Sequence, residues 1–272
     1  MAKFKHIRLL TPVYNDVSIR LQDVENLQRR DLMISQTGIP VGTPSVECEF
    51  DEALAAPYIV GRAMEAEQNN KAINENQQAS DEERKQIVDA LIVDCMSDPG
   101  LQAARETVSI PVFGPREVCM HIAAMLGHRF SYIGIKSRNR PRIERHAATY
   151  GLLHHIASVR AVDLSVTDVT QGGQHKLHER IVEESIAAVE QDGADIILIG
   201  CTAFFGCEKI VGKALLDKGH DIPVINPIRT TIAYVAGLLD LGLSHSRRTY
   251  PFPPIKKRVG YDIPNTYNIL NE

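Results

Sequence analysis

The feature that most constrains the fold is a regular alternation of short apolar runs and longer helical stretches along the chain. Seven short runs each predict a strand, and several are apolar nearly throughout, as expected for strands that are covered on both faces. They lie at 6–12, 31–37, 90–95, 129–135, 157–162, 195–201 and 221–227. The helical stretches between them lie at 50–72, 81–89, 115–126, 139–150, 175–191, 206–218 and 228–241. This order predicts an α/β fold with parallel sheets.

Two segments, one in each half of the chain, share the same order of features. Residues 89–115 and 194–227 each contain an Asp, an apolar strand, a Cys, a small polar residue, a helix, Ile-Pro-Val and a closing Pro. This internal repeat makes Cys95 and Cys201 equivalent. A single cysteine at a strand end is more often a packing residue. Two cysteines at matching strand ends favour a chemical role instead.

Both cysteines follow strands at the edge where a parallel α/β sheet binds its ligands. Loops at that edge meet helix N-termini, whose N–H groups and partial positive charge favour a thiolate. The sequence therefore predicts that the pKa of each thiol lies below the ordinary value of about 8.5. Two facing thiols can remove a proton from a carbon acid and return one to the opposite face. That chemistry is cofactor-independent racemisation or epimerisation.

Charge and cysteine content argue against several other classes of protein. The chain has 30 Lys plus Arg against 34 Asp plus Glu, without a basic block, which indicates neither a nucleic-acid nor a membrane partner. Its start has too short an apolar run for a signal peptide, and no stretch approaches the roughly 20 residues of a membrane span. We therefore expect a soluble, cytoplasmic protein. The five cysteines form no CxxC pair, so the sequence predicts free thiols and no metal site.

Six segments, in order along the chain, resemble the aspartate/glutamate racemase superfamily and, within it, the hydantoin (allantoin) racemase branch. They lie at 43–57, 94–106, 110–118, 126–134, 157–163 and 193–204. The resemblance implies two pseudo-symmetric α/β lobes, each a parallel sheet flanked by helices, with the active site in the cleft between them. The first lobe would comprise 1–114 and 226–272, and the second lobe 115–225.

The same resemblance implies the chemistry of the site. It assigns Cys95 and Cys201 as the two catalytic acid/base thiols, which act without a metal or any other cofactor. It also implies a small-molecule substrate and a homo-oligomeric assembly.

The chain departs from the hydantoin branch at positions that bear on the substrate. The first predicted strand ends in Thr11-Pro12-Val13, where hydantoin racemases typically carry Asn-Pro-Asn. Lys136 stands where the branch usually has a Thr pair, and a lysine suits a carboxylate better than a neutral ring. The Gly-Cys-Thr at 200–202 is also more similar to the amino-acid racemases. The exact substrate therefore stays open.

Hydroxyl groups and one lysine near the predicted strand ends are candidates for substrate binding, namely Thr11, Ser45, Ser97, Lys136, Ser137 and Thr202. Ser97 and Thr202, with the N–H groups that follow the cysteines, would form an oxyanion hole. The alternative for Thr11 and Ser97 is a turn or cap hydroxyl, and for Lys136 a solvated loop charge. Asp98 is expected to cap a helix that begins at Pro99.

The favoured function is 1,1-proton transfer by two cysteines at the α-carbon of a hydantoin-type or related carbonyl substrate. A racemase of a free acidic amino acid, a cis-trans isomerase and a decarboxylase are alternatives within the superfamily. A non-enzymatic binding protein is the alternative outside it.

Two further segments have no assigned role. Residues 67–86 are polar and predict an exposed helix-loop-helix excursion. Residues 247–272 predict an extended arm on the body or on a neighbouring subunit.

Overall fold

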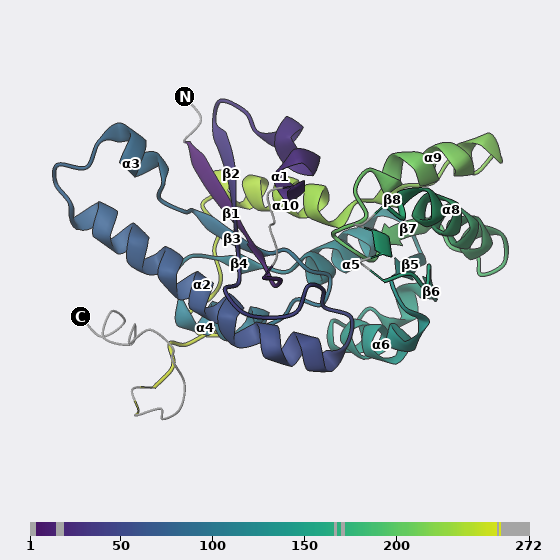
Figure 1. Cartoon of the computed structure of the whole chain (residues 1–272), viewed down its shortest axis with the longest axis horizontal. Helices are drawn as coiled ribbons and strands as arrows, with labels where there is room; N and C mark the ends of the chain where they lie inside the picture. The colour runs from purple at the N-terminus through teal and green to yellow at the C-terminus, as the bar shows by residue number, and fades with distance from the viewer. Residues whose placement is uncertain (1–3, 15–18, 166–167, 170–171, 255, 257–272) are drawn as a thin grey trace.

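Two parallel four-stranded sheets form the body of the protein (Figure 1). The computed structural model describes the chain except residues 1–3, 15–18, 166–167, 170–171, 255 and 257–272. The first sheet has the order β2-β1-β3-β4, with strands Lys5–Thr11 (β1), Leu32–Gly38 (β2), Ala90–Val93 (β3) and Val112–Phe113 (β4). The second has the order β6-β5-β7-β8, with strands Phe130–Gly134 (β5), Ile156–Ala161 (β6), Ile196–Ile199 (β7) and Val224–Ile225 (β8). The two orders are equivalent, which confirms the predicted α/β fold of two related lobes.

The central strands of each sheet end level with one another. All four residues of β3 and of β7 are buried, because helices cover both faces of each sheet. The last paired residues are Leu10 with Val93 in the first sheet and Ile133 with Ile199 in the second. The loops that carry Cys95 and Cys201 therefore leave their sheets at matching positions.

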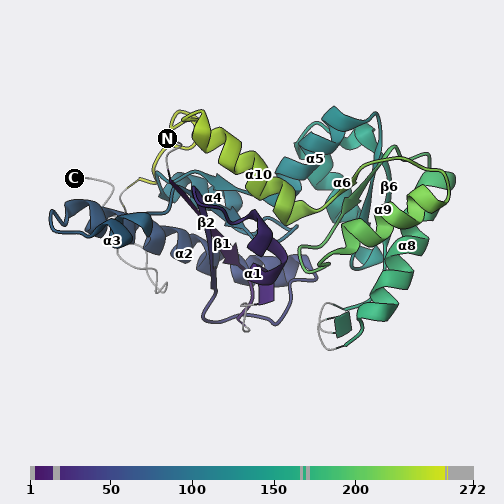
Figure 2. The same cartoon turned by 90° about the horizontal axis from the view of Figure 1, so that it is seen from above.

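Two helices cross from one sheet to the other along the chain. The helix α5 (Pro115–Leu126) follows the first sheet in the chain, but its apolar face packs on β5 and β7 of the second. The helix α10 (Pro227–Asp240) follows the second sheet and packs on β1 and β3 of the first. The two helices pack against each other (Figure 2). At their contact, the Sγ of Cys119 lies 3.4 Å from the carbonyl oxygen of Pro227. The lobe boundaries implied by the resemblance stay a prediction.

The remaining helices stay with the lobe in which they occur. In the first lobe, α1 (Ile19–Val24) packs beside α10, and α2 (Glu49–Glu75) and α4 (Leu101–Thr107) cover the opposite face. In the second, α6 (Arg140–Thr149) packs beside α5, and α8 (Gln174–Glu190) and α9 (Cys207–Asp217) cover the opposite face. Short 3-10 helices span Glu25–Leu27, Ser137–Asn139 and Leu153–His155. Among the described residues, no helix combines the length and the apolar character that a membrane span needs.

The polar segment 67–86 forms the predicted excursion. The helix α2 runs to Glu75, a turn follows, and α3 (Asp81–Lys85) ends the excursion in exposed residues (Figure 1). The arm after residue 246 lies on the body as far as it is described. Its Arg247 donates hydrogen bonds to the carbonyl oxygens of Arg105, at 3.0 Å, and Val108, at 2.5 Å. Most of the predicted arm, 257–272, lies outside the described residues.

Several boundaries differ from the sequence prediction, and prolines and glycines explain most of them. The strand predicted at 221–227 shrinks to two residues, and its counterpart β4 is as short, because Pro111 and Pro223 cannot donate to a ladder. The helix predicted at Pro99 begins only at Leu101, after Gly100 in the left-handed conformation (φ 71°). The helix predicted at 81–89 ends at residue 85.

Candidate active site

The loops of Cys95 and Cys201 have the same local geometry. Each cysteine stands two residues beyond the end of its strand. The Sγ of Cys95 accepts a hydrogen bond from the backbone N–H of Ser97 at 3.4 Å, and the Sγ of Cys201 accepts one from Ala203 at 3.4 Å. The internal repeat thus corresponds to two equivalent thiol-bearing turns.

The two loops touch each other. The hydroxyl of Thr202 donates a hydrogen bond to the carbonyl oxygen of Asp94 at 3.3 Å, and these residues are the direct neighbours of Cys201 and Cys95. The buried Tyr132 also lies close to both sulfurs: burial is the main cause of its raised pKa, and the two thiols raise it further. Each sulfur packs at the edge of its own lobe's core. The two cysteine-bearing loops therefore meet at the junction of the lobes.

Asp94 connects this junction to the first sheet. Its Oδ2 accepts a hydrogen bond from the hydroxyl of Thr11 at 2.9 Å, and that hydroxyl accepts one from the Nε2 of Gln36 at 2.7 Å. The ends of β1, β2 and β3 are thereby tied together next to Cys95. Thr11 is fully buried in this chain of bonds. Its location corresponds to the turn-hydroxyl alternative, and its predicted contact with substrate stays a prediction.

The other predicted substrate-binding residues divide into two groups. Ser97 and Thr202 are buried beside the cysteines. Ser45 bonds to the Oε1 of Glu47 at 3.1 Å in the loop before α2, and the backbone N–H of Ser137 bonds to Asp163 at 2.8 Å. Ser137 is exposed and Lys136 half-buried, and among the described residues no hydrogen bond links Ser45, Lys136 or Ser137 to either thiol.

The predicted low pKa is wrong for Cys95. Burial raises the pKa of this thiol to about 11, and the N–H of Ser97 and the charge of Arg116 oppose the shift only in part. The expected helix N-terminus is also distant in sequence, because α4 begins six residues after Cys95, at Leu101. Cys95 is therefore a neutral thiol at rest, which is the form that delivers a proton.

Asp98 caps a helix, but not the one that was expected. Its carboxylate accepts the backbone N–H groups of Arg116 at 3.2 Å and Glu117 at 3.1 Å, in the first turn of α5. A Cβ at Gly114 would overlap this carboxylate, so a larger residue there would displace Asp98 from its capping position. Burial raises the pKa of Asp98 to about 6, against the charge of Arg116 and the two N–H groups. Asp98 therefore couples the Cys95 loop to the helix that crosses into the second lobe.

This raised pKa predicts the sign of a pH effect on stability. The pKa of Asp98 changes from 3.8 to about 6 on folding, so its contribution is fully present below pH 3.8 and is lost as pH rises through about 6. Relative to Asp98→Asn, which does not titrate, the wild type is expected to lose about 2 kcal/mol between pH 4 and pH 7. Urea unfolding of both proteins across this range measures the difference. Parallel curves would contradict it.

Sequence analysis missed Arg116 and Asp94. Arg116 is 1% exposed, and its Nε donates to the carbonyl oxygen of Met96, the residue after Cys95. Its position in the first turn of a buried helix was visible in the sequence, but only the fold brings that turn against the Cys95 loop. Asp94 lies within the segment 94–106, which carries the family resemblance, but the resemblance implied a role only for its neighbour Cys95.

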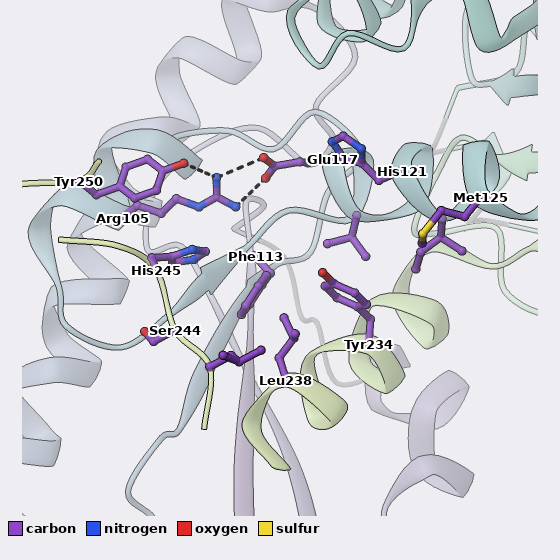
Figure 3. Close-up of a pocket in the computed structure, with 13 residues that line it drawn as sticks. Arg105, Phe113, Glu117, His121, Met125, Tyr234, Leu238, Ser244, His245 and Tyr250 are labelled. Atoms are coloured by element: carbon purple, nitrogen blue, oxygen red, sulfur yellow. Dashed lines mark hydrogen bonds and ion pairs between the residues drawn. The ribbon is translucent and has the colours of Figure 1, made fainter. Parts of the chain in front are cut away.

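A separate pocket of about 420 Å³ lies between α5, α10 and the segment 243–250 (Figure 3). The Nη2 of Arg105 forms an ion pair with the Oε2 of Glu117 at 2.5 Å, and its Nη1 bonds to the hydroxyl of Tyr250 at 3.1 Å. None of the predicted site residues lines this pocket.

Comparison with known proteins identifies the family. A family model described as Asp/Glu/Hydantoin racemase matches residues 27–235. A hydantoin racemase of Rhizobium meliloti is 30% identical over 264 residues, which cover 95% of this chain and 99% of that protein. A hydantoin racemase of a Pseudomonas species (strain NS671) is 29% identical over 233 residues, 85% of this chain and 84% of that protein. The structure of an allantoin racemase from Klebsiella pneumoniae superposes with a TM-score of 0.81 at 27% identity and covers 95% of this chain and 98% of its own.

The chain belongs to the Asp/Glu/Hydantoin racemase family, in its hydantoin racemase branch, and is an enzyme of the racemase type. The resemblance stated from six sequence segments is thereby confirmed.

Proposed function

We propose that the protein racemises a hydantoin-type or related carbonyl compound by 1,1-proton transfer between Cys95 and Cys201, without a cofactor. The observation that carries this proposal is the hydrogen bond from Thr202 to Asp94, which joins the two thiol-bearing turns. A small substrate bound between the lobes would then have one sulfur on each side of its α-carbon. The predicted homo-oligomer is not needed for this chemistry and stays a prediction.

The mechanism conserves charge across the pair of thiols. In one direction the thiolate of Cys201 removes the α-proton and leaves a planar enolate, and the neutral thiol of Cys95 protonates the opposite face. The pair then holds one proton on Cys201 and one negative charge on Cys95, ready for the reverse direction. The raised pKa of Cys95 supports its role as the proton donor in the first direction.

Donors around the sulfurs can stabilise the enolate. Without substrate, the backbone N–H groups of Ser97 and Ala203 donate to the thiols and the hydroxyl of Thr202 donates to Asp94. Each donor would exchange its present acceptor for an oxygen of the enolate when substrate binds. Fixed donors of this kind act most strongly where water is excluded. The α-proton of a hydantoin is also more acidic than that of a free amino acid, whose adjacent carboxylate opposes enolate formation. A hydantoin is therefore the easier substrate for a thiol base.

Incubation of single enantiomers in deuterium oxide tests the reaction. The panel contains 5-substituted hydantoins, allantoin, aspartate and glutamate, with a protein-free sample to subtract spontaneous exchange. Racemisation predicts decay of the circular dichroism signal to zero and one deuterium at the α-carbon. Release of carbon dioxide would indicate a decarboxylase, and a change of double-bond geometry in an added cis-dicarboxylate would indicate an isomerase. Binding without turnover of any compound would indicate a binding protein.

A further inference from the structure

Arg116 is a deeply buried cation that forms no ion pair with a carboxylate among the described residues. The described residues contain three buried arginines, and the other two are ion-paired: Arg105 with Glu117 at 2.5 Å and Arg142 with Glu52 at 3.0 Å. Arg116 is the most buried of the three, at 1% exposed. Its Nε bonds to a backbone carbonyl, and its Nη1 has no hydrogen-bond partner among the described residues.

The nearby carboxylates of Asp98 and Glu52 already accept hydrogen bonds from other donors. Asp98 directs its two oxygens at the backbone N–H groups of Arg116 and Glu117 rather than at the guanidinium. Glu52 accepts the Nη1 of Arg142, and burial raises its pKa although both arginines oppose the shift. The Nε of Arg142 is a second buried donor without a partner. A buried cation with unmet N–H groups costs several kcal/mol unless an acceptor binds it.

The guanidinium lies against the loop that carries Cys95. Its Nε holds the carbonyl oxygen of Met96, the next residue in the chain. Its charge acts on Cys95 and also on Tyr132, the ring that lies close to both sulfurs. A group bound to the Nη1 of Arg116 would therefore lie near the Cys95 loop, where the proposed substrate site is.

We propose that the substrate carries a carboxylate on its side chain and that Arg116 binds this carboxylate. The inference rests on the proposed function, because it names the substrate class of the same site. A guanidinium is always charged and matches the shape of a carboxylate, so it discriminates anions from neutral groups of equal size. The sequence suggested Lys136 for this role, but the structure places a better buried cation at Arg116.

Two matched pairs of compounds test the proposal. They are 5-(carboxymethyl)hydantoin and 5-(2-carboxyethyl)hydantoin, each with its primary amide, which has nearly the same size and no charge. The comparison uses whichever of the two carboxylic acids is the better substrate. The wild type is expected to exchange the C5 proton of this acid with a kcat/KM about 100-fold above that for the corresponding amide. Arg116→Met is expected to lose about 100-fold on the acid, mainly through KM, and less than about 3-fold on the amide. Arg116→Lys, which keeps the charge, should recover part of the loss.

Controls separate this proposal from a structural role and from the proposed function. Arg248→Met, at an exposed arginine, should leave both rates unchanged, and thermal unfolding reports whether the Arg116 variants fold. Equal losses on acid and amide, or no preference of the wild type for the acid, would overturn the role of Arg116. Calorimetric binding of the same compounds gives a second readout. If the acid binds in a way that depends on Arg116 but its C5 proton does not exchange, the role of Arg116 is supported and the proposed reaction is wrong. If the acid does not bind to the wild type, the role of Arg116 is wrong.

Discussion

Replacement of either Cys95 or Cys201 by serine is expected to lower the rate of racemisation by about 10³-fold or more. A hydroxyl is a much weaker acid than a thiol, so the variant lacks a group that can exchange a proton with the α-carbon on that face. The measurement is the initial rate of circular dichroism change for the best substrate of the panel. Cys48→Ser is the matched control, because Cys48 is the N-cap residue of α2 and serine is a good cap. Its rate should equal that of the wild type.

The two variants should also differ from each other. Each keeps one thiol, which can still remove and return a proton on its own face of the carbon. Cys95→Ser and Cys201→Ser are therefore expected to exchange deuterium into opposite enantiomers without inversion. This complementary pattern assigns each sulfur to one enantiomer. Full activity of both variants would show that the two-thiol mechanism is wrong.

Gly200→Ala is expected to destabilise the protein by about 3 kcal/mol or more. A Cβ at this position would overlap the ring of Tyr132 and lie 2.7 Å from the carbonyl oxygen of Ile133. Neither can move easily: the hydroxyl of Tyr132 bonds to the carbonyl oxygen of Gly200 at 2.8 Å, and Ile133 is paired within the sheet. Because Gly200 precedes Cys201, activity should fall with stability. Urea unfolding measures the change.

Gly61→Ala provides the control for this substitution. Gly61 lies within α2, and a Cβ there would meet no atom within 4 Å. Alanine has the higher helix propensity, so this variant is expected to be more stable by about 0.5–1 kcal/mol. Similar free energies of unfolding for the two variants would show that the space beside Tyr132 does not restrict residue 200.

The fold was predictable because its local and long-range patterns agree. The helix predicted at 115–126 has the same first and last residues as α5, since Pro115 is favoured in a first turn and a glycine follows the end of the helix. The strands β3 and β7 were recognisable as short apolar runs. The two-residue strands β4 and β8 could not be bounded, because flanking prolines make them too short for a periodic pattern. The sheet on which α5 and α10 pack cannot be read from their local sequence; only the family resemblance, with lobe boundaries at 115 and 226, implied an assignment.

The site was predictable where it follows from the repeat. Equivalent cysteines at equivalent strand ends are a sequence pattern, and the structure joins their loops through Thr202. The surroundings of each side chain in the folded protein could not be predicted in this way. Burial at the lobe junction, which raises the pKa of Cys95, and the approach of Arg116 to Met96 both depend on tertiary packing. Lys136 stood out as a cation in the sequence, whereas the buried Arg116 did not.

The exchange of α5 and α10 has a consequence for how the molecule can be divided. A fragment that stopped after β4 would leave the apolar surfaces of Ile7, Leu9 and Ile92 without the helix that covers them. The complementary fragment, from residue 114 onward, would keep α5 but would leave the apolar side chains of α10, such as Ile232 and Val235, without the sheet on which they pack. Neither half is self-sufficient, so denaturation is expected to proceed as a single cooperative event, and expression of separate halves should yield insoluble chains unless both are made together.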